Sequence, residues 1–337
     1  MGMVPLVSLK QAPAFNVVQI DLFGPWIARG EVQKRTSGKC WGVLFVCLAS
    51  RAVHIEIIAG YSTDDFLMGL QRFGALRGWP HKLSSDPGSQ LVAAEKELQN
   101  AWKDINFKTV EKECTNHKTN WQFSPADSPH YQGVTESLIK TVKRAIKVMY
   151  SHSVRLSWQE YVTMGYQVAD MVNTCPLGII GEVDDSLSVL TPNSLLLGRN
   201  SSDNPGCWPE GHNIPRLSEV NRIVGRFWSK WMELCRPALL TEKKWNTDVR
   251  NLEVDDIVLV LDNDPISRQY KLAKVCEVKT GKDGKVRSAQ VEYRKFKTNE
   301  IGTLKYSGSS PIKVTRCCQR LVLIVPVEEL LVHKNDY

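Results

Sequence analysis

The stretch that decides the fold is Trp121-Gln-Phe-Ser-Pro-Ala-Asp-Ser-Pro-His-Tyr-Gln-Gly-Val-Thr-Glu136, continued by Ser-Leu-Ile-Lys-Thr-Val-Lys-Arg-Ala-Ile-Lys-Val-Met149. Its aromatic start favours a short strand. The middle contains two prolines and a glycine, which favour a loop. The remainder predicts a helix that carries Glu136 in its first turn.

Two stripes run along this predicted helix. Four residues spaced four, three and four apart form a charged stripe: Glu136, Lys140, Lys143 and Lys147. An apolar stripe is formed by Ile139, Val142, Ile146 and Met149. The helix is therefore expected to pack one face on a core and to offer the other to an anionic ligand. The plainer alternative is a solvated helix face with an i,i+4 ion pair.

Two more carboxylates stand at the ends of predicted elements. Asp21 lies in the apolar strand that begins at Phe15, and an acid in such a strand is costly to bury unless it is paired or binds a metal. Asp86 follows a short strand at 81–85 and precedes a predicted helix at 90–103. Asp86 is also explained as a turn or N-cap residue.

The pattern from 15 to 175 predicts one mixed α/β domain, a sheet flanked by helices. Strands are expected at 41–50 and 52–58, the second with a polar face made by His54 and Glu56. Helices are expected from Ser62 or Thr63 to Arg77 and, with a Ser157 cap and Glu160 in the capping-box position, to Asn173. Residues 104–119 show no regular pattern.

The rest of the chain predicts a second, smaller domain. Residues 1–14 are expected to be a tail, 176–216 a connector, 217–246 a tryptophan-rich helix, 247–330 a basic small β-barrel and 331–337 a tail. Residues 221–318 hold 20 Lys and Arg against 12 Asp and Glu, an excess of eight, whereas the other residues hold 23 against 24. The basic character therefore belongs to the C-terminal third, as in polyanion-binding modules or a plain solvated surface.

Composition excludes several classes of protein. The 337 residues are 42% hydrophobic and 23% charged, and the longest apolar runs are too short to span a bilayer. The nine cysteines form no CxxC pair and are interpreted as reduced thiols of an intracellular protein. Cys114 and His117 supply only half of a zinc site, so no zinc is expected in this chain.

Asp21, Asp86 and Glu136 each stand where an element meets a loop, and such ends gather on one edge of an α/β sheet. Three carboxylates without His or Cys suit Mg²⁺ or Mn²⁺. Two such ions can clamp the attacking and leaving oxygens of an in-line displacement at phosphorus. The lysines behind Glu136 would then hold nucleic-acid phosphates.

The motifs that contain these acids resemble the Asp-Asp-Glu core of retroviral and retrotransposon integrases. They are Ile20-Asp-Leu-Phe-Gly-Pro25, Ser85-Asp-Pro-Gly-Ser-Gln-Leu91 and Pro129-His-Tyr-Gln-Gly-Val-Thr-Glu-Ser137. Trp41–Glu56 and Leu190–Arg199 resemble the integrase region of BEL/Pao-type LTR retrotransposon polyproteins. The tail, notably Val254-Asp-Asp-Ile-Val-Leu-Val260, resembles the basic domain that follows the core there.

The resemblance implies an RNase H-like fold followed by a small SH3-like barrel, with Mg²⁺ (or Mn²⁺), as two ions, held by Asp21, Asp86 and Glu136. It implies trimming of element DNA ends and their joining to target DNA. Lys140 and Lys143 match residues that approach the element's DNA end, and Tyr131 and Gln132 match the mobile loop before the Glu.

The family also sets expectations about partners and about departures from its pattern. We expect a homo-oligomer in the nucleus, with no membrane or small-molecule partner. The 49 residues between Asp86 and Glu136 exceed the retroviral spacing. The family's zinc-binding domain before the core is not expected in this chain. The alternative is a fragment or host-adopted copy that binds DNA or chromatin without joining it.

Overall fold

The structure is a computed structural model. It describes residues 13–30, 37–60, 62–85, 104–123, 129–149, 155–183, 186–198, 215–239, 250–261, 271–281, 283–293, 296–298, 304–306 and 311–328. The chain divides into two compact units. The core unit comprises residues 5–173 and 205–231, and the C-terminal unit comprises residues 1–4, 174–204 and 232–337.

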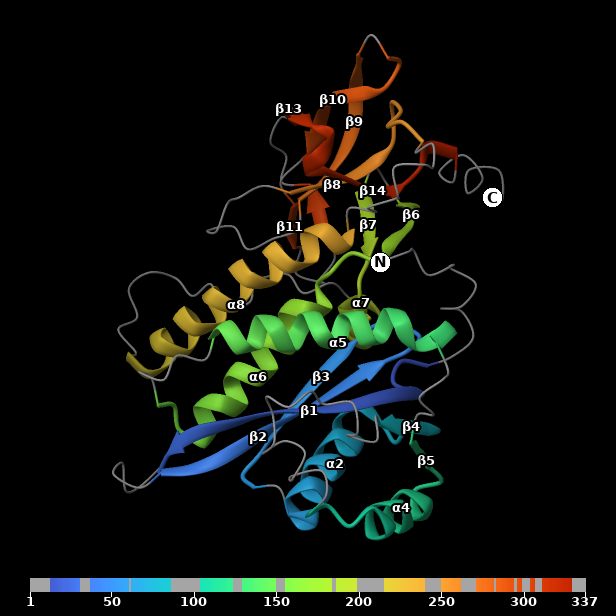
Figure 1. Ribbon diagram of the computed structural model, residues 1–337. Helices are drawn as coiled ribbons and strands as arrows, with labels where there is room; N and C mark the ends of the chain where they lie inside the picture. Colours follow the sequence, from blue (N-terminus) through green and yellow to red (C-terminus); the bar gives the residue numbers. More distant parts are fainter. Residues whose placement is uncertain are drawn as a thin grey trace. The chain divides into compact units, whose positions relative to one another are not determined.

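The core unit is built on a five-stranded mixed sheet with the order β3-β2-β1-β4-β5 (Figure 1). Its strands are β1 (Val17–Arg29), β2 (Ser37–Cys47), β3 (Val53–Ile58), β4 (Lys82–Ser85) and β5 (Asn120–Phe123). The first three pair antiparallel, whereas β4 runs parallel to β1 and β5 runs parallel to β4. The mixed α/β sheet flanked by helices that the sequence predicts is therefore present.

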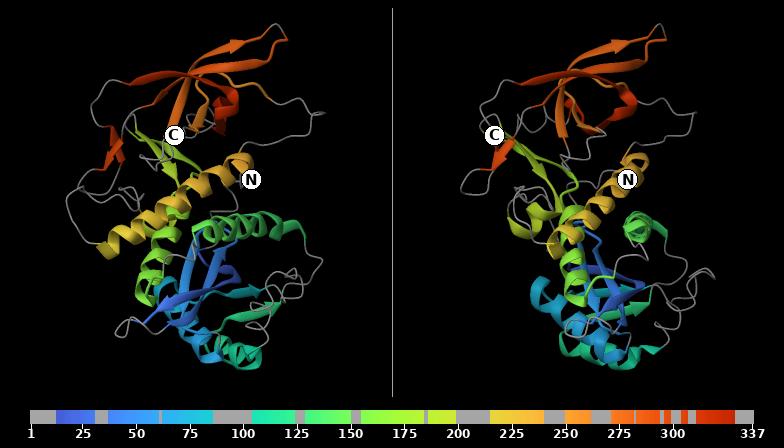
Figure 2. Two further views of the ribbon diagram at one scale, coloured as in Figure 1. Left: turned by 60° about the vertical axis from the view of Figure 1, so that its left-hand side comes forward. Right: turned by 90° about the vertical axis from the view of Figure 1, so that its left-hand side faces the viewer.

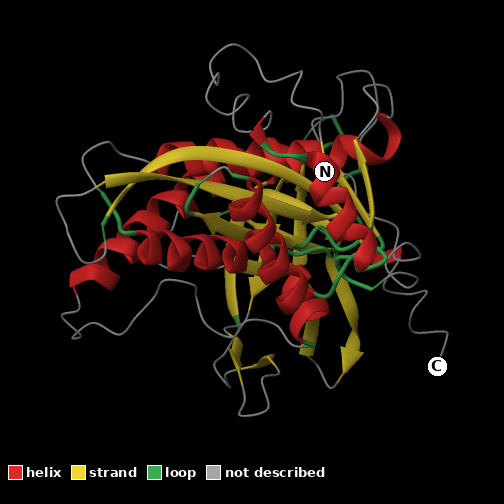
Figure 3. Cartoon of the chain, turned by 90° about the horizontal axis from the view of Figure 1, so that it is seen from below, coloured by secondary structure: helices red, strands yellow, loops and turns green. Residues whose placement is uncertain are grey.

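Helices cover both faces of this sheet. On one face, Gly165 of α6 (Trp158–Asn173) packs on Ile55 and Ile57 of β3. On the other, Gly69 of α2 (Thr63–Arg77) packs on Ile58, one residue further along the strand. Since neighbouring strand residues point to opposite faces, α6 and α2 enclose the sheet between them. Figure 3 shows the strands between layers of helix.

The interior of the core unit follows from the apolar run of β2. Every residue from Cys40 to Cys47 is buried, so this inner strand is covered on both sides. The Phe45 ring stacks on Phe73 of α2, with ring centroids 4.1 Å apart. Gly42 is required beside Phe23, because a Cβ atom there would lie 2.0 Å from the Phe23 ring. These contacts fix β1 and β2 in register and leave Asp21 at a defined position.

Two sequence predictions for the core unit were wrong. The strand that carries Asp21 does not end close to this residue, because a shift of register between Phe23 and Trp26 lets pairing with β2 continue to Arg29. Residues 104–119 are not irregular, because Asn106 caps α4 (Phe107–Asn116) and the helix buries Val110 and Cys114. His54 and Glu56 form the polar face predicted for β3, and both side chains are buried.

The helix that carries Glu136 also begins earlier than predicted. α5 runs from Pro129 to Met149, so Glu136 lies two turns inside it rather than in its first turn. Proline is well placed at the first helical position, where its missing N–H donates no intrahelical bond. The apolar stripe was predicted correctly, because Ile139, Val142, Ile146 and Met149 are all buried.

The C-terminal unit contains a five-stranded antiparallel sheet with the order β13-β10-β9-β8-β14 (Figure 2). Its strands are β8 (Ile257–Val260), β9 (Lys271–Thr280), β10 (Val286–Tyr293), β13 (Ile312–Cys317) and β14 (Leu321–Val325). In β13 only alternate residues, such as Ile312 and Val314, turn inward. The prediction of a second set of short antiparallel strands is confirmed by this sheet.

Smaller elements complete this unit. The predicted connector contains the hairpin β6 (Gly178–Val183) and β7 (Ser186–Leu190) and the short helix α7 (Pro192–Leu197). A second two-stranded sheet joins β11 (Phe296–Thr298) to β12 (Leu304–Tyr306). A short 3-10 turn, Cys318–Arg320, precedes β14.

The helix α8 (Pro215–Leu239) contributes to both units, the core unit to Trp231 and the C-terminal unit from Met232. It buries Phe227, Trp228 and Trp231, as the tryptophan-rich pattern indicated. Within the described residues, no helix combines the length and apolarity needed to cross a membrane.

Candidate nucleic-acid site

The site is centred on an ion pair between Asp21 of β1 and Lys143 of α5. Lys143 Nζ donates to Asp21 Oδ2 over 3.1 Å, and the two side chains are 19% and 20% exposed, respectively. Asp21 pairs with Leu44 across β1 and β2, and Leu44 pairs with Ile55. Cross-strand partners share a face of the sheet. Asp21 therefore lies on the face that α5 and α6 cover.

The residues of the charged stripe of α5 differ in their exposure to solvent. Glu136, Lys140 and Lys147 are exposed, whereas Lys143 is half-buried against Asp21. Tyr131 and Gln132 lie in the first turn of α5, not in a loop as predicted, and their side chains lie outside the described residues. The contact between Lys143 and Asp21 was missed, because nothing in the sequence links positions 122 residues apart.

Asp86 lies outside the described residues, so the meeting of Asp21, Asp86 and Glu136 stays a prediction. The strand that precedes Asp86 is informative. β4 pairs in parallel with β1, with Ser84 opposite Gln19 and Ser85 opposite Ile20. Ser85 is thus the last described residue before Asp86, and its partner Ile20 is the residue before Asp21.

The predicted ligands are of the kind that a hard divalent cation prefers. Asp21 and Glu136 offer carboxylate oxygens, the ligands that Mg²⁺ prefers. Among the described residues, which omit Asp86, no three His, Cys, Asp or Glu side chains lie close enough together to hold a metal ion. The chemistry of the residues agrees with the predicted Mg²⁺, while the complete ligand set rests on Asp86.

A second carboxylate, Glu56 of β3, lies on the opposite face in a closed network. His54 Nε2 and Tyr166 Oη lie 2.9 and 3.0 Å from Glu56 Oε1, and Arg72 Nε donates to Glu56 Oε2 over 2.8 Å. Arg77 Nε donates to His54 Nδ1, so the other ring nitrogen carries the proton and donates to Glu56. Burial lowers the pKa of His54 despite the opposing effect of Glu56. This network holds β3, α2 and α6 together.

A third carboxylate, Glu160 of α6, anchors the start of α8. It accepts from Arg29 of β1 over 2.8 Å and from Arg216 of α8 over 2.6 Å. The Ser157 backbone N–H also donates to Glu160, which completes the predicted capping box. Burial would raise the pKa of Glu160, but the hydrogen bonds from Arg216, Ser157 and Arg29 outweigh it and lower the pKa to about 2.

Cys114 and His117, which the sequence offered as half of a zinc site, make contacts within the core unit instead. Burial, with Glu113 and Glu111 nearby, raises the pKa of the Cys114 thiol to about 12, which disfavours the thiolate that binds zinc. The His117 ring stacks on Trp79, with centroids 3.8 Å apart. Cys114 and His117 thus have structural roles in the core unit.

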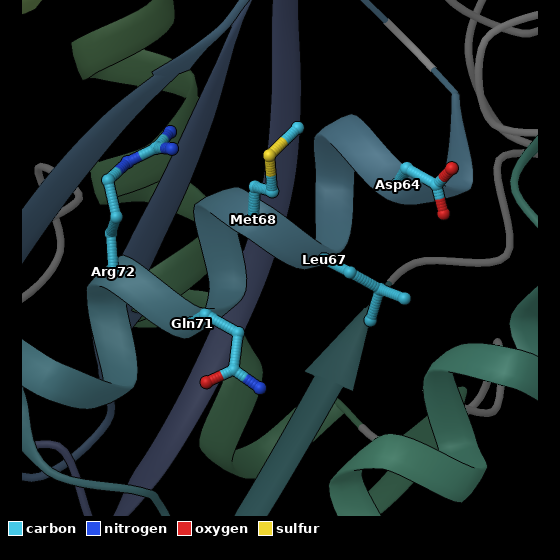
Figure 4. A pocket seen from close by; sticks show the side chains of 5 residues that line it. All are labelled: Asp64, Leu67, Met68, Gln71 and Arg72. Carbon is cyan, nitrogen blue, oxygen red and sulfur yellow. The ribbon is translucent and has the colours of Figure 1, made fainter.

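One pocket of the core unit lies away from the candidate site. It has a volume of about 490 Å³, and Figure 4 shows that its walls all come from α2: Asp64, Leu67, Met68, Gln71 and Arg72. Because α2 packs on the face opposite Asp21, this pocket contributes nothing to the candidate site.

Comparison with known proteins gives one family match and several weak structural similarities. A model described as "Family of unknown function (DUF5641)" matches residues 215–303. No curated protein matches the chain. Similar solved structures include integrases of several viruses.

A chain of the simian T-cell lymphotropic virus intasome, in complex with the PP2A regulatory subunit B56 gamma, is 12% identical, with 93% of this chain and 80% of that chain covered and a TM-score of 0.32. The HTLV-2 integrase catalytic core domain with magnesium, in its dimeric form, is 12% identical over 48% of this chain and 88% of that one, with a TM-score of 0.29. The BIV integrase catalytic core domain is 15% identical over 55% and 95%, with a TM-score of 0.31. Similarities this weak do not decide function.

Proposed function

We propose that this chain is an Mg²⁺-dependent polynucleotidyl transferase of the integrase type, from a BEL/Pao-type retrotransposon, which trims element DNA ends and joins them to target DNA. Asp21, Asp86 and Glu136 hold the metal. Its partners are DNA and further copies of the chain, and its place of action is the nucleus.

The observation that carries the proposal is the meeting of β1, β4 and α5 at Asp21. The pairing of Ile20 with Ser85 supports the assignment of Asp86, the next residue of the chain, to the neighbourhood of Asp21. The ion pair of Lys143 with Asp21 supports the assignment of Glu136, which lies on the same stripe of α5, to the same edge. Glu136 lies seven residues before Lys143, two turns along the same stripe.

The residues of this chain have distinct tasks in the proposed reaction. Asp21, Asp86 and Glu136 hold Mg²⁺, which when bound neutralises charge on the phosphate and orients the attacking and leaving oxygens. Lys140 and Lys147, both exposed, hold phosphates of the DNA backbone. The basic C-terminal unit adds contacts that do not depend on sequence. Catalysis then rests mainly on positioning and charge neutralisation.

The test is Mg²⁺-dependent joining of a labelled oligonucleotide to plasmid DNA, with Glu136→Gln beside the unaltered chain. We expect the substitution to reduce joining by at least about a hundredfold, a loss like that caused by removing one charge-stabilising group from an active site. DNA affinity should be equal or higher, because a negative charge near the phosphates is removed. Equal joining by both proteins would refute the catalytic assignment. DNA binding by the unaltered chain without joining would instead favour a DNA- or chromatin-binding protein.

The exposed lysines give a separate prediction. Lys140→Ala should weaken DNA binding uniformly across sequences and reduce the slope of log affinity against log salt by about one, the effect of losing one phosphate contact. Filter binding or fluorescence anisotropy at several salt concentrations measures this slope. Leu195→Ala, a substitution at an exposed uncharged side chain of α7, is the control and should leave the slope unchanged. An unaltered slope in Lys140→Ala would remove Lys140 from the interface.

A further inference from the structure

Lys143 differs from the other lysines of its stripe. Lys140 and Lys147 project into solvent, whereas Lys143 is 19% exposed and its ammonium group lies 3.1 Å from Asp21 Oδ2. A lysine needed only to hold DNA gains nothing from this partial burial. Its contact is with the acid that the proposed function assigns to metal binding.

The packing of α5 explains why Lys143 reaches Asp21. The adjacent residue Val142 is fully buried, as is Ile146, so α5 is held against the sheet on this side. Lys143 lies at the border of that apolar face, where its carbon chain can follow the surface and its charged end meets the carboxylate. The packing of α5 on the sheet therefore brings Lys143 close to Asp21.

We infer that Lys143 and the divalent cation are alternative partners of Asp21, so that metal binding releases Lys143 to a DNA phosphate. This inference rests on the proposed function and concerns the regulation of the same site. An ammonium group next to a carboxylate disfavours a second cation there by charge repulsion. By the same repulsion, a divalent cation bound at Asp21 weakens the ion pair between Asp21 and Lys143 by an equal free energy.

The coupling is reciprocal. If metal and Lys143 compete for Asp21, a phosphate that draws Lys143 away raises metal affinity, and the metal raises phosphate affinity by the same factor. The chain would bind metal weakly without DNA and more tightly with it. Lys143 is thus a positioning residue that links the two ligands, while Lys140 and Lys147 serve DNA alone.

The experiment is titration of the full-length chain with MnCl₂, followed by the electron paramagnetic resonance signal of free Mn²⁺. Lys143→Met keeps a long unbranched side chain at this position of α5 and removes the charge. The melting temperature of the variant reports whether the fold is intact. Arg144→Met is the matched control, because Arg144 is exposed on the same helix and carries the same charge. We expect Lys143→Met to bind Mn²⁺ on the order of tenfold more tightly than the unaltered chain, within the usual range of such couplings. Arg144→Met should match the unaltered chain.

Asp21→Asn distinguishes a failure of the competition between Lys143 and metal from a failure of the proposed metal site. Loss of Mn²⁺ binding in Asp21→Asn, with equal affinities in Lys143→Met and the unaltered chain, would overturn the competition and leave the proposed metal site standing. Equal tightening in Arg144→Met would overturn it as well, since the effect would then be one of overall charge. Failure of the unaltered chain to bind Mn²⁺ at all, with or without DNA, would refute the metal site on which both proposals depend.

Addition of a short duplex DNA tests the link itself. We expect the duplex to raise the Mn²⁺ affinity of the unaltered chain by about the factor gained in Lys143→Met, and to change that variant little. A DNA effect of the same size in both proteins would show that Lys143 does not transmit it, and would overturn the inference.

Discussion

Glu56 and Asp21 are carboxylates in strands of one sheet, yet their surroundings differ. Glu56 is 1% exposed and both of its oxygens accept from neighbours, His54 and Tyr166 on one and Arg72 on the other. Asp21 is 20% exposed and meets the end of a flexible lysine. An acid enclosed by rigid donors from three elements serves the fold. An acid at the rim, paired with a side chain that can move, remains accessible to a ligand.

The largest effect on stability is therefore expected at Glu56. Glu56→Gln removes the charge that pairs with Arg72 and turns an amide N–H₂ toward groups that donate. Breaking a buried ion pair from one side typically costs 3–5 kcal/mol, and since Arg72 is 38% exposed we expect about 3 kcal/mol. Urea unfolding followed by tryptophan fluorescence measures the loss. A change below about 1 kcal/mol would contradict the structural role of Glu56.

The role of Glu56 shows where the sequence was informative and where it was not. The alternation of polar and apolar residues placed His54 and Glu56 on one face of a strand. A solvent-exposed polar face and a buried, hydrogen-bonded polar face give the same sequence pattern, so the alternation does not distinguish them. Arg72 and Arg77 in the next helix were the signal that could have distinguished the two. The contact of Lys143 with Asp21 left no such signal, because it depends on how α5 packs on the sheet.

The elements were predicted best where local chemistry determines them. The end of α2 at Gly78, with its left-handed φ of 84°, and the capping box of Ser157 and Glu160 were both readable from local residue types. The start of α5 was not, since Pro129 can close a loop or open a helix. Whether Pro129 ends a loop or begins a helix is decided by the tertiary contacts of the buried apolar stripe of α5. Of the three acids, Asp21 and Glu136 fall within described elements, and Asp86 stays a prediction.

A smaller effect than that of Glu56 is expected at Glu160, with a clear dependence on pH. Its pKa of about 2 in the folded chain lies below the ordinary value of 4.5, so the stabilisation is complete above about pH 4.5 and is lost as the pH falls toward 2. Glu160→Gln should cost about 2 kcal/mol at pH 7, a figure reduced for the exposure of Arg216. Thermal melts from pH 7 to pH 2 measure it.

The pH dependence of stability is compared between the unaltered chain and Glu160→Gln. The unaltered chain should lose stability between pH 4.5 and pH 2 more steeply than Glu160→Gln, because the variant has no carboxylate to protonate there. Parallel curves for the two proteins would mean that Glu160 is not held ionised by Arg29 and Arg216. The anchoring of α8 would then have another cause.

The smallest effect on stability, below about 1 kcal/mol, is expected for Asp21→Asn. A partly exposed carboxylate–lysine pair contributes little to folding, since water screens the charges and the lysine loses rotamer freedom when held. The same urea experiment as for Glu56→Gln makes the comparison direct. If Asp21→Asn cost as much as Glu56→Gln, Asp21 would be a structural acid, and its accessibility would no longer argue for a ligand. A stable variant that has lost Mn²⁺ binding is the combination that a ligand-binding acid requires.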